Sequence, residues 1–426
     1  MVRAYDVCRP DAVAAAPGAL EDVLAARFGH SAFRSGQREV IEAVLAGRDA
    51  LAILPTGGGK SVTFQFPAAA TGRTSLVISP LIALMRDQVD QARRRGLTAA
   101  SVDSTLGDTE RRSVLRDVRD GRLELLYASP EGLPRLLGEL DGCAAVGLFA
   151  IDEAHCLSQW GHDFRPDYRL LGEARERLAP GVPALAVTAT ATSRVAADIV
   201  ATARLRDPFV LRGTFFRRNL RLATRRKDAV RDARGDVLAL VRAHEGQAAI
   251  VYRLSRAGAA SFAAWLRRHG VPAAAYHAGL DSEHRSAVQD AFLSGETQVV
   301  VATVAFGMGV DKPDVRLVVH ADLPDSIEAY AQEVGRAGRD GEASDCVLFY
   351  SWADVRRRDA LTRGLEPVRR AAARIAVREV YRFAAGGSCR HRTLCAHFDE
   401  RIARPCGACD VCGALSAGRL LVRGGW

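Results

Sequence analysis

The segment Thr56-Gly57-Gly58-Gly59-Lys60-Ser61 has the residues needed to bind the phosphates of a nucleotide. It follows an apolar run at residues 49–54 and precedes a helical pattern. Glycines allow backbone N–H groups to close around phosphate oxygens, and the N-terminus of the next helix adds a positive dipole. Lys60 supplies a positive charge, and the Ser61 hydroxyl can ligate Mg²⁺. A flexible glycine turn is the alternative, which the Lys-Ser pair directly after the glycines disfavours.

A second polar segment, Asp152-Glu153-Ala154-His155, follows an apolar run at residues 146–151. Acids at the carboxyl end of a parallel strand stand where ligands bind in such sheets. Asp152 would hold magnesium, largely through water, and Glu153 would orient and deprotonate the attacking water. Two surface acids that cap a helix are the alternative, but a position about 90 residues after a phosphate loop favours nucleotide chemistry. Together the two segments predict ATP hydrolysis.

Hydrolysis also needs cations on the γ-phosphate, and the segment at residues 332–341 supplies two arginines. Arg336 and Arg339 are three residues apart, a spacing that would place them on one helical face. We expect them in a second domain, so that hydrolysis would depend on domain closure. An ordinary surface arginine pair is the alternative, and it is the commoner origin of such spacing.

Four cysteines near the C-terminal end, Cys389, Cys406, Cys409 and Cys412, have the spacing C-x16-C-x2-C-x2-C. Four thiolates at short spacing suit tetrahedral zinc, and an iron–sulfur cluster is the rival interpretation. We expect the zinc to be structural, because no ligand position is left open. Cys395 is interpreted as a packing residue, with a role as substitute ligand left open.

Apolar runs alternate with helical patterns through most of the chain, which predicts parallel sheets with helices on both faces. The strands restart after a basic segment at residues 212–222, and they stop at Trp352. We therefore expect two α/β domains, residues 1–212 and 213–350, and a small helical zinc-binding subdomain, residues 351–426. Alanine-rich patches are expected to be helical. The predicted strands are residues 49–54, 75–79, 123–128, 146–151, 184–188, 248–252, 298–302, 316–320 and 345–350.

The composition is that of a folded domain protein with a basic balance. The 426 residues are 48% hydrophobic and carry a formal net charge of +9, which permits a polyanionic partner. Only three cations are lysine, Lys60, Lys227 and Lys312, which we attribute to codon bias. No apolar run is long enough for a membrane span and no secretory signal is recognisable. A cytoplasmic, nucleoid-associated location with reduced cysteines is expected.

Further motifs stand in a characteristic order along the chain. They are Phe33-Arg34-Ser35-Gly36-Gln37, the phosphate loop, Ser79-Pro80-Leu81-Ile82-Ala83-Leu84, Asp152-Glu153-Ala154-His155, Thr188-Ala189-Thr190, Tyr276-His277-Ala278-Gly279-Leu280, Ala302-Thr303-Val304-Ala305-Phe306-Gly307-Met308-Gly309-Val310-Asp311-Lys312-Pro313 and the arginine segment. With this set the chain resembles the RecQ family of superfamily 2 DNA helicases, from about residue 21 to residue 412. The strict eight-residue phosphate loop would need glycine at position 54, where leucine stands, and the shorter form is the helicase variant.

The resemblance implies two RecA-like parallel-sheet domains in tandem, followed by the zinc subdomain. It implies that Arg34 and Gln37 read the adenine of ATP, with Gln37 bonding the base edge. Arg339 would be the arginine finger, with Arg336 and Gln332 nearby. ATP, Mg²⁺ and Zn²⁺ are the implied cofactors. The ATP-binding set would be Arg34, Gln37, Thr56, Gly57, Gly58, Gly59, Lys60, Ser61 and Gln332.

The stretch at residues 156–168 resembles the aromatic-rich loop that couples strand binding to hydrolysis in this family. Aromatic side chains can stack bases, worth about 1–3 kcal/mol each, and an arginine can meet phosphate. The DNA-binding or coupling set would be His155, Ser158, Trp160, Phe164 and Arg165. A buried aromatic cluster under a loop is the alternative, and it is the commoner one without the resemblance.

We therefore expect an ATP-dependent 3′–5′ DNA helicase of repair or recombination, acting on single-stranded and forked DNA. Residues 413–426 are too few for the winged-helix and helical domains that RecQ proteins commonly carry, which predicts weaker unwinding. A translocase that unwinds poorly is one alternative. A zinc-dependent DNA-binding regulatory module without catalysis and an RNA substrate are the others. Single-strand-binding and repair proteins are candidate partners, no membrane partner is expected, and a monomer is favoured.

Overall fold

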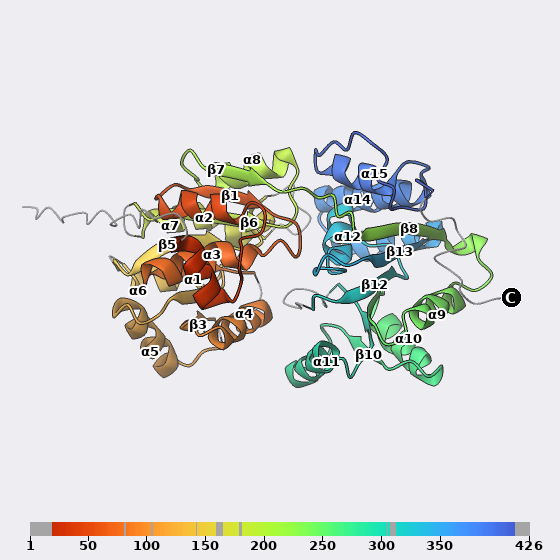
Figure 1. Ribbon diagram of the computed structural model, residues 1–426, viewed down its shortest axis with the longest axis horizontal. Coiled ribbons are helices and arrows are strands. Elements are labelled where there is room, and N and C mark those ends of the chain that lie inside the picture. The colour runs from red at the N-terminus through yellow and green to blue at the C-terminus, as the bar shows by residue number, and fades with distance from the viewer. Residues whose placement is uncertain are drawn as a thin grey trace, which may run out of the picture. The chain divides into compact units, whose positions relative to one another are not determined.

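The computed structural model describes residues 19–413, apart from residues 81, 104, 142, 159–164, 179–180, 305 and 307–311. Contacts divide the chain after Gly213 into two compact units, residues 1–213 and 214–426. Each unit contains its own parallel sheet with surrounding helices (Figure 1). In the described part of the chain, no helix is both long enough and apolar enough to cross a membrane.

The first unit is built on a seven-stranded parallel sheet with strand order β3-β4-β2-β5-β6-β1-β7. Its strands are β1 (Ala50–Ile53), β2 (Thr74–Ile78), β3 (Ala99–Val102), β4 (Leu125–Ala128), β5 (Val146–Ile151), β6 (Ala184–Thr188) and β7 (Phe209–Arg212). Its α-helices are α1 (Ala19–Phe28), α2 (Gln37–Leu45), α3 (Lys60–Thr71), α4 (Ile82–Arg94), α5 (Asp108–Arg119), α6 (Leu133–Glu139), α7 (Leu171–Glu176) and α8 (Ser193–Thr202), and short 3₁₀ turns occupy Ala154–Leu157 and Pro166–Leu170.

The second unit is built on a six-stranded parallel sheet with strand order β10-β11-β9-β12-β13-β8. Its strands are β8 (Leu220–Arg226), β9 (Ala248–Tyr252), β10 (Ala273–Tyr276), β11 (Val299–Ala302), β12 (Val315–His320) and β13 (Ser344–Tyr350). Its α-helices are α9 (Ala233–Ala243), α10 (Arg256–Arg268), α11 (Ser282–Ser294), α12 (Ile327–Val334), α13 (Trp352–Leu361), α14 (Pro367–Ala385) and α15 (Arg390–His397), with 3₁₀ turns at Lys227–Ala229 and Thr362–Gly364.

Each sheet is buried by helices that follow its strands, as the alternating pattern predicts. Phe64 and Phe66 of α3 pack with Tyr127 of β4 in the first core. Phe262 and Leu266 of α10 pack with the apolar residues of β9 and β12 in the second core. The predicted fold class, two parallel-sheet domains with a helical C-terminal segment, is confirmed.

The nine predicted strands are present, and four further strands were missed. Two of them, β3 and β10, are alanine-rich, so the expectation that alanine-rich patches are helical was wrong there. Parallel pairing with β4 and β11 holds these short segments extended, because tertiary context overrides alanine's helix propensity. The basic segment contains the start of β8, which forms an edge of the second sheet.

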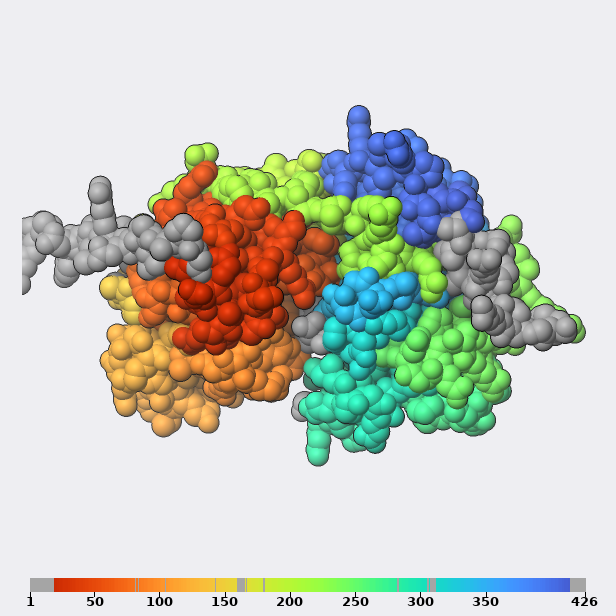
Figure 2. Space-filling model, in the orientation of Figure 1, coloured from red at the N-terminus to blue at the C-terminus, as the bar shows by residue number. Residues whose placement is uncertain are grey.

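The helical segment from α13 to α15 (blue in Figure 2) packs on the second sheet and lies in the second compact unit. The main chain at the cysteine cluster pairs with edge strand β8. Leu222 N–H donates to Ala408 O (3.1 Å) and Asp410 N–H donates to Leu222 O (3.0 Å). The loop that carries Cys409 thereby extends this sheet by one bridge, Leu222 to Cys409.

Candidate nucleotide site and zinc centre

The glycine-rich loop lies between β1 and α3, with its residues half-buried. Gly57 and Gly59 have φ of 83° and 73°, in the left-handed region that favours glycine. A Cβ on Gly59 would lie 2.3 Å from Gln37 Nε2, so the Gln37 amide would have to shift to admit a side chain there. The main chain turns at Gly58, whose N–H donates to Pro55 O (2.8 Å). The loop therefore leads into α3 at Lys60, and the first N–H groups of a helix have no partner within the helix and can bind phosphate.

Gln37 and Arg34 hold this loop from the side. Gln37 is 3% exposed, and its Nε2 donates to Gly59 O (2.9 Å) while its Oε1 accepts from Arg34 N–H (2.8 Å). The Arg34 guanidinium donates to Gly57 O. Both side chains thus contact the phosphate loop directly, and their predicted contact with adenine remains a prediction.

Asp152 follows β5 at the same carboxyl edge of the sheet as the loop after β1, with β6 between the two strands. Its side chain is buried, and Oδ2 accepts from Gln88 Nε2 (3.0 Å) while Oδ1 accepts from Glu153 N–H (2.9 Å). Burial, with repulsion from Glu153, raises the pKa of Asp152 to about 6, and Lys60 opposes this rise. A buried carboxylate near Lys60 suits a divalent cation, which would offset its desolvation.

Glu153 stands in an unusual backbone conformation, with φ 48° and ψ 47°, at the start of the 3₁₀ turn. Such a conformation costs a non-glycine residue on the order of 1 kcal/mol or more and is concentrated at functional sites. His155 Nδ1 lies 3.3 Å from Glu153 Oε2 and 3.1 Å from Thr188 Oγ1. The predicted base is therefore in contact, through His155, with the Thr188-Ala189-Thr190 motif at the end of β6.

The residues at both ends of the predicted coupling loop form hydrogen bonds with the rest of the first unit. Arg165 N–H donates to Cys156 O (3.0 Å), and its guanidinium donates to Pro80 O (2.7 Å). Ser158 Oγ donates to Asp198 Oδ2 of α8 (2.6 Å). Trp160 and Phe164, predicted to stack bases, lie outside the described residues. The predicted phosphate contact of Arg165 stays a prediction, and its observed guanidinium contact joins the loop to the Ser79–Leu84 motif.

Arg336 and Arg339 do not share a helical face, and that expectation was wrong. Helix α12 ends at Val334, and both arginines stand in the turns that follow, where Gly338 has φ 53°. A Cβ on Gly338 would lie 2.5 Å from Asn219 Nδ2. Arg217 NH2 donates to Gly338 O (2.7 Å), so the basic segment before β8 fixes this turn. Arg336 is buried, whereas Arg339 and Gln332 are half-buried.

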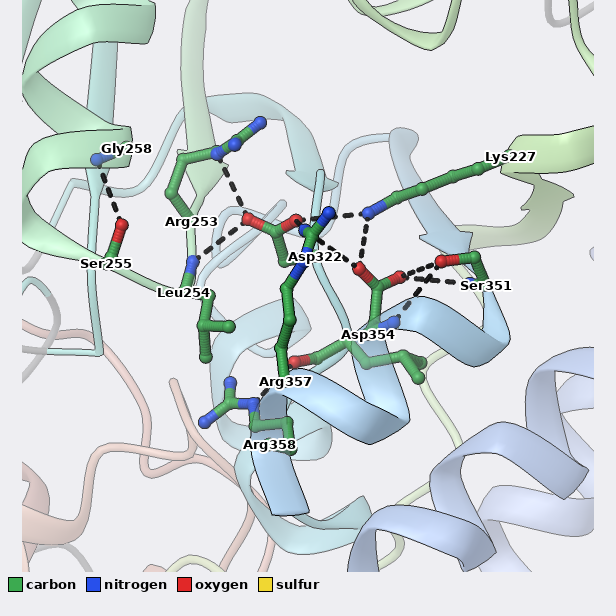
Figure 3. A network of polar contacts seen from close by, with 11 residues as sticks. Lys227, Arg253, Leu254, Ser255, Gly258, Asp322, Ser351, Asp354, Arg357 and Arg358 are labelled. Carbon is green, nitrogen blue, oxygen red and sulfur yellow. Dashed lines mark hydrogen bonds and ion pairs between the residues drawn. The ribbon is translucent and has the colours of Figure 1, made fainter. Parts of the chain in front are cut away.

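A buried ion network of the second unit was not foreseen (Figure 3). Lys227, just after β8, places its Nζ 3.0 Å from Asp322 Oδ1 and 2.9 Å from Asp354 Oδ1. Asp322 also receives Arg253 Nε (3.0 Å) and Leu254 N–H (3.1 Å). The network joins the ends of β8, β9 and β12 to the start of α13. The rarity of lysine in this chain is the sequence signal that could have directed attention to Lys227.

The four predicted cysteine ligands converge. Their sulfur atoms all lie within 4.8 Å of one another, and Cys406 Sγ and Cys412 Sγ are 3.9 Å apart. Tetrahedral zinc with Zn–S bonds of about 2.3 Å requires sulfurs about 3.8 Å apart, so the cluster fits zinc. Burial opposes ionisation of Cys389, but main-chain N–H groups of Arg392 and Cys406 lower its pKa to about 7. Cys395 is fully buried outside this group, as a packing residue would be.

Arg390 attaches the zinc loop to the rest of the unit. Its side chain is buried, and Nε donates to Asp410 Oδ1 (2.9 Å), between two of the cysteines. NH1 donates to Phe383 O (2.6 Å) and Gly386 O (2.8 Å), at the end of α14. NH2 donates to Thr224 Oγ1 of β8 (2.9 Å). One side chain therefore connects the zinc loop, α14 and the sheet edge.

Three family models match the chain in order. They are the DEAD/DEAH box helicase model over residues 34–199, the helicase conserved C-terminal domain over residues 232–341, and the RecQ zinc-binding domain over residues 352–413. The ATP site and the zinc centre are thereby supported by the domain families to which these residues belong.

Relatives and solved structures agree with these models. The chain is 43% identical over 394 residues to the ATP-dependent DNA helicase RecQ of Pasteurella multocida, covering 92% of this chain and 62% of that protein. It is 36% identical over 397 residues to an Acanthamoeba polyphaga mimivirus protein that carries the provisional name of an ATP-dependent RNA helicase, covering 92% and 72%. Saccharomyces cerevisiae Dbp5 bound to RNA and ADP BeF3 shares the fold, with 17% identity, a TM-score of 0.64 and coverage of 87% and 98%.

The chain spans somewhat less than two thirds of the bacterial RecQ proteins it matches. Within that span the ordered motifs, the two parallel sheets and the four-cysteine cluster occur together. The chain belongs to the RecQ family of superfamily 2 helicases.

Proposed function

We propose that this chain is an ATP-dependent DNA helicase that moves 3′ to 5′ along single-stranded DNA and separates duplex strands. The observation that carries the proposal is the arrangement at the carboxyl edge of the first sheet. There the phosphate loop and the buried Asp152 follow strands separated only by β6. Asp152 and Ser61 would hold Mg²⁺ on the ATP phosphates, and the ion would offset negative charge as the γ-phosphate departs.

The chain's own residues supply the remaining chemistry. Lys60 would contact the phosphates, and Glu153, held by its left-handed backbone, would orient the attacking water. Arg336 and Arg339 would stabilise charge on the γ-phosphate, as arginine fingers do in related ATPases. His155, Ser158, Trp160, Phe164 and Arg165 would link strand binding to these groups. Zinc at the cysteine cluster would be structural, because the four sulfurs fill a tetrahedral shell.

An ATPase assay with and without single-stranded DNA tests the enzymatic core of the proposal. The wild type should hydrolyse ATP faster with DNA, and Lys60→Ala should lower turnover at least 100-fold. Arg122→Ala is the control, because Arg122 is exposed and its ion pairs in the described part of the chain are with two surface acids of its own segment. Turnover of Lys60→Ala equal to that of the wild type would remove the phosphate loop from the mechanism.

A strand-displacement assay on forked substrates separates the remaining alternatives. A 3′-tailed DNA fork should be unwound and a 5′-tailed one should not. An RNA loading strand tests the substrate that the viral relative's name suggests. ATP hydrolysis without displacement would indicate a translocase, and DNA binding without hydrolysis would indicate a regulatory module.

A further inference from the structure

Two hydrogen bonds from different parts of the first unit hold the Asp152 carboxylate. Oδ1 accepts from the Glu153 N–H (2.9 Å), and Oδ2 accepts from Gln88 Nε2 of α4 (3.0 Å). Asp152 and Gln88 are both buried. One donor on each oxygen fixes the rotation of the carboxylate, and each oxygen can still accept a second hydrogen bond or contact an ion. The carboxylate therefore has one defined orientation before any ion binds.

Helix α4 holds Gln88 in place. Met85 and Ala92 of this helix lie in the apolar core of the unit, three residues before and four residues after Gln88. Residues at these spacings share one helical face, so Gln88 lies on the packed face of α4. Just before the helix, Pro80 O accepts from the Arg165 guanidinium (2.7 Å), at the end of the predicted coupling loop. Gln88 thus connects Asp152 to the segment that this loop contacts.

The other half of the Gln88 amide distinguishes this contact from an ordinary packing interaction. Its Oε1 is buried and has no hydrogen-bond partner among the described residues. A buried carbonyl oxygen without a partner costs free energy similar to what one hydrogen bond contributes. Gln88 therefore adds little net stability, and an apolar side chain of similar size would fold as well. Its hydrogen bond to Asp152 is better explained by the chemistry of that carboxylate.

We propose that Gln88 is a positioning residue for Mg²⁺, whose amide orients the Asp152 carboxylate toward the ion. This role rests on the proposed ATPase function, in which Asp152 holds Mg²⁺ largely through water. Gln88 touches neither the ion nor the nucleotide. Without the amide, Oδ2 loses its donor and the carboxylate can rotate, so the ion should bind more weakly. Loss of a hydrogen-bond partner of a metal ligand typically weakens metal affinity about 10–100-fold.

Gln65 of α3 provides a matched control in the same unit. It is also buried, but both halves of its amide have partners other than Asp152. Nε2 donates to the Tyr127 hydroxyl (3.3 Å), and Oε1 accepts from Arg95 NH1 (3.3 Å). Gln65→Met and Gln88→Met therefore delete the same buried group, and only the second removes a donor from Asp152. A purely structural role of these amides predicts that Gln65→Met is the more damaging variant in every assay.

The test titrates Mn²⁺, a paramagnetic substitute for Mg²⁺, into the full chain in excess over a fluorescent ADP analogue. Electron paramagnetic resonance measures the free Mn²⁺. Gln88→Met should raise the Kd for Mn²⁺ about tenfold, with the Kd for the analogue in EDTA changed less than about twofold. Gln65→Met should bind Mn²⁺ like the wild type. The urea midpoint should fall by about 0.5 M in Gln65→Met and stay near that of the wild type in Gln88→Met.

Three outcomes would overturn the role of Gln88. One is a Kd for Mn²⁺ in Gln88→Met equal to that of the wild type, and another is an equal loss of Mn²⁺ affinity in the two variants. The third is weaker metal-free binding of the analogue by Gln88→Met, which would indicate a general disturbance of the site. A wild type that binds Mn²⁺ with the analogue but does not hydrolyse ATP would instead refute the proposed ATPase function, so the two failures are distinguishable.

Discussion

Lys227 bridges two buried carboxylates, so its replacement by methionine should destabilise the second unit strongly (Figure 3). Methionine keeps most of the chain length and removes the charge. Asp322 and Asp354 are each no more than 3.0 Å from the same nitrogen, so the two oxygens are at most about 6 Å apart. At an effective dielectric constant near 20, two like charges at about 6 Å repel by about 3 kcal/mol.

Removing one partner of a buried ion pair typically lowers the stability of a protein by about 3–5 kcal/mol. Arg253 still contacts Asp322 in the variant. We therefore expect Lys227→Met to lower the free energy of unfolding by about 3 kcal/mol. With a urea m value of about 2 kcal/mol per M, the midpoint should fall by about 1.5 M. Circular dichroism would follow unfolding, and hydrogen exchange of peptides from β9 and β12 would assign it to the second unit.

The stability deficit of Lys227→Met should also depend on pH, in a direction that follows from the pKa of Asp322. Burial opposes ionisation of Asp322, but Lys227 and Arg253 outweigh it and hold its pKa below the usual value. The stability that the ionised Asp322 contributes is present above its unfolded pKa near 4 and is lost as pH falls through its folded pKa. In Lys227→Met the acids can protonate to relieve their repulsion, so the difference from the wild type should shrink between pH 7.5 and pH 5.

Two variants complete the design. Arg226→Ala removes the neighbouring cation, which pairs with Asp228 in solvent, and should leave the midpoint unchanged. Adding Asp322→Asn to Lys227→Met removes one of the two carboxylates that repel each other and should recover part of the loss. A midpoint shift of less than about 0.5 M for Lys227→Met, on the order of a surface pair, would contradict a buried ion pair at Lys227, and so would an equal deficit at both pH values.

Three further predictions concern the phosphate loop, the zinc loop and a histidine pair. Gly59→Ala should weaken binding of a fluorescent ATP analogue at least tenfold. A Cβ would meet Gln37 Nε2, and the backbone angle φ of 73° costs alanine about 1–2 kcal/mol. Wild-type affinity in this variant would contradict the observed loop conformation. Arg390→Ala should lower the free energy of unfolding by about 3–5 kcal/mol and release zinc to a chelator faster. Arg390→Lys should show the same defects, because one ammonium cannot replace the hydrogen bonds of the planar guanidinium. Zinc release from Arg390→Ala at the wild-type rate would refute this prediction. Burial opposes protonation of His397, but the hydrogen bond and charge of Glu328 outweigh it and raise the pKa of His397 above 6.5. The pair therefore stabilises the folded state fully below pH 6.5, and this stabilisation is lost as pH rises through the folded pKa. Glu328→Gln should therefore cost about 1 kcal/mol at pH 6 and less at pH 9 in urea titrations, and an equal cost at both would exclude the pair as the cause.

Features that depend on residues close together in the chain could be predicted without the structure. The phosphate loop is one, because three glycines followed by Lys60 and Ser61 suffice to specify a turn into a helix. The four cysteines are another, because their spacing restricts the metals that four thiolates can hold. Most strands were also predictable, since a buried parallel strand is a short apolar run.

The distant residues that contact these features became known only from the folded chain. Gln88 meets Asp152 across 64 positions, and Arg217 fixes a turn 121 positions later. Local propensity could not predict these contacts, nor the extended state of alanine-rich β3 and β10, because parallel pairing brings remote strand ends to one edge. The arginine segment is the clearest case in which local spacing failed to predict the structure. Its spacing predicted a helical face, but α12 ends at Val334 and Gly338 turns the chain, so packing against Arg217 and Asn219 decides where the arginines lie.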